Sequence, residues 1–133
     1  MTLKTLLIVF TGSGIGGICR YVLSQAVSSS IAQKPASLSI FPVGTLAVNF
    51  IGCFLMGILL AKVGVEGKSS PLYLALGTGL LGGFTTASAF SGDALSLIQQ
   101  KQMGLAGLYI FGTVVLCLVG VAAGFAIAGG TKA

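Results

Sequence analysis

The chain has 133 residues, of which 55% are hydrophobic and only 7% are charged, and its mean hydropathy is +1.06. A soluble globular domain carries about 25% charged residues, so this composition excludes that class and predicts a polytopic membrane protein. The net charge of +5 comes from dispersed basic residues, whereas a nucleic-acid-binding face needs a basic patch. We therefore expect membrane lipid, and no nucleic acid, among the partners.

Four stretches are long and apolar enough to cross a membrane, which takes about 20 mostly apolar residues. In chain order they are residues 3–27, 43–63, 71–99 and 103–128. A polar loop at 28–42 and two short turns, at 64–70 and 100–102, connect them. The sequence predicts an all-α membrane protein, with residues 1–133 forming a single domain of four transmembrane helices.

Small residues recur within these spans. Gly120 and Gly124 are separated by three residues, a spacing that lets membrane helices approach closely. Cys19, Cys53 and Cys117 all lie in apolar segments, without C-x-x-C spacing and without histidine. That pattern gives no support to a zinc site, so we interpret the cysteines as small packing residues.

The basic residues give almost no preference for one orientation in the membrane. With four spans, one side of the membrane receives Lys4, Lys62, Lys68 and Lys132, and the other receives Arg20, Lys34 and Lys101. Because the number of Lys and Arg residues on each side sets orientation, four against three allows insertion in both directions. This balance predicts dual topology and an antiparallel homodimer.

The run Gly79–Ser91 places glycines and hydroxyl side chains inside the apolar third span. Non-helical backbone at membrane depth is tolerated only where it is buried in protein or lines a wet cavity. The run therefore indicates a pathway or an ion site, and not a plain membrane anchor.

Two further polar residues lie within predicted spans. Arg20 interrupts the apolar pattern of the first span, and a charge there is costly enough to be a functional hypothesis by default. The alternative is an arginine that extends to the interface or joins helices through backbone carbonyls. Asn49, in the second span, has an amide that either joins helices or contacts an anion in a pore.

Hydroxyl and thiol side chains recur at helical spacing in the fourth span. Tyr109, Thr113 and Cys117 follow one another at i, i+4 and i+8, and so share one face of a helix. With Ser88 and Ser91 of the third span they form a candidate ladder along which an ion exchanges its hydration shell for protein groups.

Missing groups limit the alternatives. A proton-coupled exporter needs a titratable group along its path, but the chain has no histidine and its two acids, Glu66 and Asp93, do not lie early in a span. A small exporter of the multidrug-resistance type shares the four-span plan but would carry a carboxylate in the first span. Hydrolysis lacks a histidine base, so we expect no enzyme. A non-conducting membrane subunit, whose polar residues only pack helices, is a further alternative.

Three motifs occur in order along the chain. They are Gly-x-x-x-Arg-Tyr at 16–21, Pro-x-Gly-Thr-Leu-x-Val-Asn-x-x-Gly at 42–52, and Gly-Gly-Phe-Thr-Thr-x-Ser-x-Phe-Ser at 82–91. Together they resemble the CrcB/Fluc family of fluoride channels over essentially the whole chain. The resemblance implies an antiparallel, dual-topology homodimer with two pores that exports fluoride passively across the cytoplasmic (inner) membrane.

The same resemblance implies particular site residues. The third helix breaks near its middle, and a structural sodium ion at the dimer centre is held by backbone carbonyls at Gly82 and Thr85. Phe90 matches the second of two phenylalanines whose ring edges, which carry partial positive charge, face the anion. The remaining pathway positions are the pore asparagine Asn49, the first-helix arginine Arg20, and the polar-track residues Ser91, Tyr109 and Thr113.

The chain departs from the family pattern at two positions. Ala87 stands where the first of the two phenylalanines is expected, and Ala89 replaces the usual threonine. Loss of the ring removes one edge contact and leaves room for water. We therefore expect altered fluoride throughput, with the fold and the sodium site unaffected.

Overall fold

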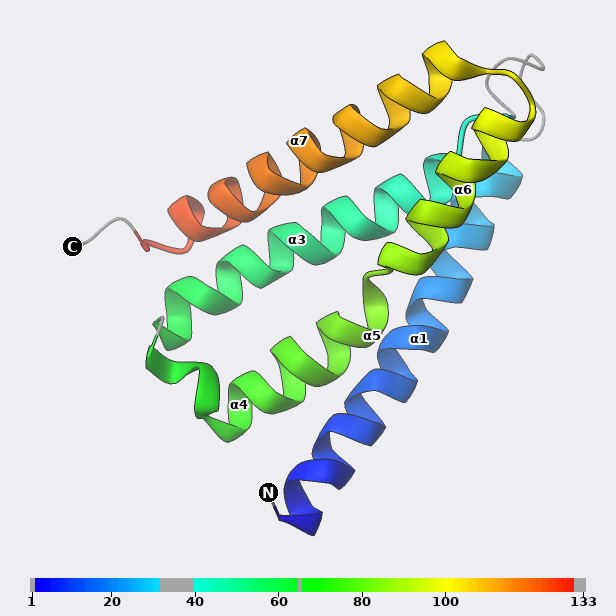
Figure 1. The fold of residues 1–133 in the computed structure, drawn as a ribbon. Coiled ribbons are helices and arrows are strands. Elements are labelled where there is room, and N and C mark those ends of the chain that lie inside the picture. The colour runs from blue at the N-terminus through cyan, green and yellow to red at the C-terminus, as the bar shows by residue number, and fades with distance from the viewer. Residues whose placement is uncertain (1, 32–39, 65, 131–133) are drawn as a thin grey trace.

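The computed structural model describes residues 2–31, 40–64 and 66–130. In these residues every regular element is a helix, which confirms the predicted all-α class. The long helices are α1 (Leu3–Ile31), α3 (Val43–Val63) and α7 (Met103–Ile127). Between α3 and α7 the shorter elements are the 3₁₀ helix η1 (Glu66–Ser69), α4 (Pro71–Tyr73), the π-helix η2 (Leu74–Leu81), α5 (Gly82–Phe84) and α6 (Ala87–Gln99), as Figure 1 shows.

Among the described residues, three helices are long and apolar enough to cross a membrane. They are Leu3–Ser30, Val43–Val63 and Met103–Ile127, with mean hydropathies of 1.6, 2.2 and 2.5. The predicted third span, 71–99, is divided among α4, η2, α5 and α6. Lys34 and Lys132, which entered the charge comparison, and most of the predicted 28–42 loop lie outside the described residues.

The first helix continues beyond its predicted end. It was expected to stop at residue 27, but α1 extends to Ile31. The hydroxyls of Ser29 and Ser30 donate to the carbonyl of Ala26 at 3.0 and 2.8 Å. Serine hydroxyls that bond back to the preceding turn are compatible with a helix, so this polar stretch does not end α1.

Glycines bring the helix backbones into direct contact. A β-carbon added at Gly57 of α3 would overlap the carbonyl oxygen of Val121 in α7, and one at Gly124 would overlap that of Phe54. On the other side of the bundle, a β-carbon at Gly16 of α1 would overlap the carbonyl of Leu80. The close approach expected at Gly124 is therefore confirmed, and it fixes α7 along α3.

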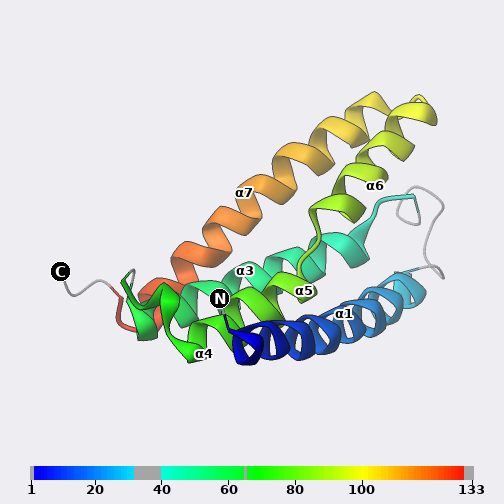
Figure 2. The same ribbon diagram turned by 60° about the horizontal axis from the view of Figure 1, so that its bottom comes forward.

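The helices form one bundle in which α6 diverges from α1. Helix α7 lies along α3, α1 lies along η2 and α5, and α6 turns away from α1 to pack against the first part of α7 (Figure 2). The α6–α7 contact contains the buried cluster Ala94, Leu97, Ala106 and Tyr109. Large apolar side chains on α1 and α7 point outward, and Phe10 and Phe111 are each 75% exposed, which is typical of a surface that faces lipid or another subunit.

Candidate functional site

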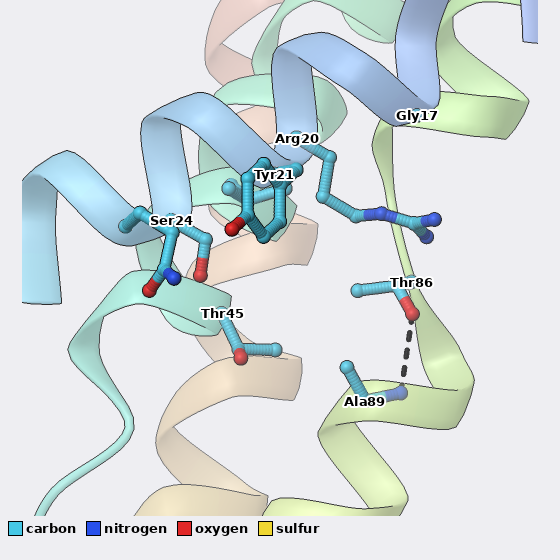
Figure 3. A pocket seen from close by; sticks show the side chains of 9 residues that line it. Gly17, Arg20, Tyr21, Ser24, Thr45, Thr86 and Ala89 are labelled. Carbon is cyan, nitrogen blue, oxygen red and sulfur yellow. Dashed lines mark hydrogen bonds between the residues drawn. The ribbon is translucent and has the colours of Figure 1, made fainter. Parts of the chain in front are cut away.

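Two threonines between α5 and α6 have extended backbones. Thr85 has φ −74° and ψ 157°, and Thr86 has φ −149° and ψ 110°. The Thr86 hydroxyl accepts a hydrogen bond from the backbone N–H of Ala89 at 3.1 Å and so caps the start of α6 (Figure 3). The Thr85 N–H keeps its helical bond to the Leu81 carbonyl at 3.0 Å, whereas the backbone groups of Thr86 leave the helical pattern and need other partners.

Asn49 supplies partners for both backbone groups of Thr86. The Thr86 N–H donates to Asn49 Oδ1 at 2.8 Å, and Asn49 Nδ2 donates to the Thr86 carbonyl at 3.2 Å. Both residues are buried. The amide therefore joins α3 to the junction, as the helix-joining alternative predicted. This pair uses one of the two Nδ2 hydrogens, which leaves the second for another ligand.

A cavity of about 370 Å³ opens beside this pair, between α3, α6 and α7. We call it the α3–α7 cavity. It is lined by Asn49, Cys53, Thr85, Thr86, Ala87, Phe90, Thr113, Val114, Cys117, Leu118 and Val121. The hydroxyl of Thr113 is buried and has no hydrogen-bond partner in the described part of the chain. Since an unpaired buried hydroxyl is costly, it is a group that a bound ligand would satisfy.

A second cavity, of about 360 Å³, lies between α1, the start of α3 and α6. We call it the Arg20 cavity; its lining is Gly17, Arg20, Tyr21, Ser24, Gln25, Thr45, Val48, Thr86 and Ala89. Figure 3 shows Arg20 reaching from α1 toward Thr86. Its Nη1 donates to the Thr85 carbonyl at 3.5 Å, so Arg20 joins α1 to the junction while its positive charge faces the cavity.

Thr86 lines both cavities. The lining residue that the two cavities share is therefore the one whose backbone is extended and held by Asn49. A continuous helix would present satisfied backbone and packed side chains at this depth, whereas this junction places backbone carbonyls and hydroxyls between two open spaces. The arrangement provides polar groups in series across the middle of an apolar bundle.

Asp93 forms a polar junction that the sequence analysis missed. Its Oδ2 accepts hydrogen bonds from Thr45 Oγ1 at 2.6 Å and from Tyr109 Oη at 3.3 Å, and so joins α3, α6 and α7. The Tyr109 ring is fully buried and lies 5.3 Å from the ring of Phe90. A carboxylate inside an apolar segment is itself a signal of a functional or structural role, and that signal was available in the sequence.

Comparison with known proteins identifies the family. The model of the family described as "CrcB-like protein, Camphor Resistance (CrcB)" matches residues 7–125. The chain belongs to the CrcB family.

Several curated relatives of this family are similar over nearly their full length. A protein of Novosphingobium aromaticivorans is 41% identical over 119 residues, which is 90% of this chain and 91% of the relative. One from Cereibacter sphaeroides is 42% identical over 98% of this chain and 99% of its own, and one from Rhizobium etli is 43% identical over 91% and 93%. Each of these relatives is named "Fluoride-specific ion channel FluC". Family membership and the apolar helices together make this chain a multi-pass membrane protein.

The structure brings only some of the predicted CrcB-family site residues together. Asn49, Ala87, Phe90 and Thr113 line the α3–α7 cavity, together with Cys117 of the predicted ladder. Arg20 lines the Arg20 cavity instead. Tyr109 adjoins Phe90, but its hydroxyl is bonded to Asp93. Ser88 and Ser91 are exposed and line neither cavity.

Proposed function

We propose that this chain is a fluoride channel through which fluoride leaves the cytoplasm passively, and that it has no enzymatic activity. The observation that carries the proposal is that the Arg20 cavity and the α3–α7 cavity share Thr86 as a lining residue. Fluoride itself is supported by the names of the relatives, since pore geometry alone does not distinguish it from other small anions.

In this proposal an anion passes from the Arg20 cavity, beside Thr86, into the α3–α7 cavity; we call this path the route. Along it the anion exchanges its water for a series of weak hydrogen-bond donors. Selective conduction needs binding that is favourable enough for entry and weak enough for exit. The Arg20 guanidinium attracts the anion into the first cavity, the free Nδ2 hydrogen of Asn49 meets it at the junction, and the Thr113 hydroxyl receives it in the second. The ring edge of Phe90 adds a contact through its partial positive charge. At the junction and in the second cavity the contacts are neutral groups, so no fully buried opposite charge traps the ion there.

Tyr109 acts in this proposal as a positioning residue. It donates its hydroxyl to Asp93 and packs against Phe90, so it holds the ring that faces the route. Ser88 and Ser91 are exposed on α6. They join the route only where a second subunit closes over that face of the helix.

We infer that the second subunit is another copy of this chain in the opposite orientation. Thr85 and Thr86 lie near the middle of the 71–99 segment, so in this proposal the third span breaks near the middle of the membrane. Exposed polar groups at that depth cannot face lipid, and the hydroxyl-bearing Ser88 and Ser91 are exposed in the single chain. A covering partner satisfies this requirement, and the balanced basic residues permit the antiparallel arrangement in a cytoplasmic membrane.

The break also has backbone oxygens suited to a structural sodium ion. In a continued helix the Gly82 carbonyl would accept from the Thr86 N–H, but that N–H is bonded to Asn49. Among the described residues, the extended Thr85 carbonyl accepts only one long hydrogen bond, of 3.5 Å from Arg20 Nη1. Hard cations favour such oxygen ligands, and two antiparallel copies would supply four. When bound there, sodium would neutralise carbonyl dipoles between the two subunits. Replacing sodium by a large organic cation is then expected to lower the thermal unfolding temperature of the dimer, and an unchanged temperature would contradict the assignment.

Fluoride efflux from liposomes that contain the purified protein tests this function. The expected result is fluoride efflux down its concentration gradient that persists when a protonophore removes any pH gradient. Efflux that requires a pH gradient would favour an exporter, and the absence of efflux would favour a non-conducting subunit. Either of these results would contradict the proposal.

A further inference from the structure

The contact between α3 and α7 brings two cysteines together. The two helices run in the same direction, since Phe50 lies beside Gly120 and Phe54 beside Gly124. Gly57 lies against the backbone of Val121. Cys53 is one turn before Gly57, and Cys117 is one turn before Val121, so the two thiols meet at the next level of the same interface.

Both thiols face the α3–α7 cavity. Cys53 and Cys117 are free, half-buried and among the residues that line it. The register of α3 against α7 places the two residues at the same level of the helix contact, and both line the same cavity. Cys19 differs from both in burial and in position, because it is exposed on α1 and lines neither cavity.

A second observation points to a ligand in the same place. Thr113 is only 5% exposed and lines this cavity one turn before Cys117. Its hydroxyl has no hydrogen-bond partner among the described residues. Two convergent thiols and an unsatisfied hydroxyl therefore share one hollow of about 370 Å³.

We propose that Cys53 and Cys117 form a two-thiolate site for a soft, thiophilic divalent metal ion, for which mercury(II) is the probe. Thiolate sulfur selects soft metal ions. Each thiol releases one proton and forms one metal–sulfur bond, and no oxidant takes part. The two thiolate charges cancel the charge of the ion, so the product is neutral. Neutrality favours the site because a net charge in an apolar bundle is costly.

An ion bound there obstructs the route. Cys53 follows Asn49 by one turn and Cys117 follows Thr113 by one turn, and all four residues line the α3–α7 cavity. The metal ion would occupy space that the anion needs. This consequence, but not the metal binding itself, rests on the proposed channel function.

Two variants with equal numbers of thiols test the site. Cys19→Ser keeps the proposed pair, whereas Cys117→Ser keeps Cys19 and Cys53, which do not share a cavity. Each purified full-length variant is loaded with one mercury(II) per chain and washed with a monothiol, and the retained metal is measured by elemental analysis. Two linked ligands raise the effective concentration of the second bond, so Cys19→Ser is expected to retain mercury that Cys117→Ser loses. Equal retention, or equal loss, would overturn the proposal.

Fluoride efflux from liposomes provides the second readout. Mercury(II) is expected to block Cys19→Ser, and the half-blocking concentration is expected to rise at least about tenfold in Cys117→Ser, since even outer partners of a metal change affinity by about 10–100-fold. Equal sensitivity of the two variants would contradict obstruction by the pair. A protein that retains mercury but conducts no fluoride would support the metal site and overturn the channel function, so the two failures are distinguishable.

Discussion

The side chain of Asn49 pairs with both backbone groups of Thr86, accepting from its N–H at 2.8 Å and donating to its carbonyl at 3.2 Å. One amide thus replaces the two hydrogen bonds that Thr86 would make within a helix. The pair stabilises an extended residue in the interior of the bundle, and that residue lines both cavities.

Replacing Asn49 by alanine removes both partners. Each unsatisfied buried backbone group costs about 1–3 kcal/mol, so we expect Asn49→Ala to lower the free energy of unfolding and to slow fluoride efflux strongly. Thermal unfolding in detergent and efflux from liposomes measure the two effects. Thr78→Val, at an exposed position of η2 that lines neither cavity, is the matched control. Normal efflux in Asn49→Ala would remove this residue from the route.

A substitution at Thr113 should change fluoride conduction without lowering stability. Thr113→Val keeps the shape of the side chain and removes a buried hydroxyl that has no partner among the described residues, so the free energy of unfolding should stay unchanged or rise. A hydrogen bond to a charged group contributes about 1.5–3 kcal/mol, and its loss should slow fluoride efflux by about tenfold or more. Thr113→Ser retains the hydroxyl and should conduct. If Thr113→Val conducts as fast as the unmodified chain, the hydroxyl does not contact the anion.

Asp93 accepts from both Thr45 and Tyr109, so its removal leaves two donors without a partner. We expect Asp93→Ala to destabilise the protein by about 2–6 kcal/mol, at about 1–3 kcal/mol per unsatisfied group. Tyr109→Phe alone should cost less. In the double variant the costs should not add, because one orphaned hydroxyl is then absent. Additive costs, measured by unfolding in detergent, would contradict a direct bond between Asp93 and Tyr109.

Two glycines of α7 offer a matched pair for helix packing. A β-carbon at Gly124 would overlap the Phe54 carbonyl, whereas one at Gly112 meets nothing within 4 Å. Gly124→Ala should therefore separate α3 from α7 and lower the unfolding temperature. Gly112→Ala should be neutral, or stabilising by up to about 1 kcal/mol through helix propensity. Equal effects of the two substitutions would contradict the close α3–α7 contact.

The sequence predicted the long helices because apolar length is a local property. Hydropathy located α1, α3 and α7 within a few residues, and it missed the end of α1 because serine hydroxyls bond within that helix. The candidate site was harder to predict from the sequence. The Gly79–Ser91 run indicated unusual backbone, but the Asn49–Thr86 pair joins residues 37 apart in the chain.

The spacing of residues along a helix also does not predict which partner each side chain contacts. Tyr109, Thr113 and Cys117 share a helical face, yet Thr113 and Cys117 line the α3–α7 cavity while the Tyr109 hydroxyl is bonded to Asp93. The partner of that hydroxyl comes from α6 and Thr45 of α3 completes the junction. Only the three-dimensional packing of three helices decides which hydroxyls stay available.

The most direct measurement compares fluoride with chloride efflux from liposomes that hold the purified protein, beside an Ala87→Phe variant. Ala87 lines the α3–α7 cavity and is exposed, so a ring there should displace water and restore an edge contact for the anion. We predict fluoride-selective efflux in the unmodified chain, and faster fluoride efflux with chloride still excluded in Ala87→Phe. Equal efflux of fluoride and chloride, or no efflux from either protein, would contradict the account.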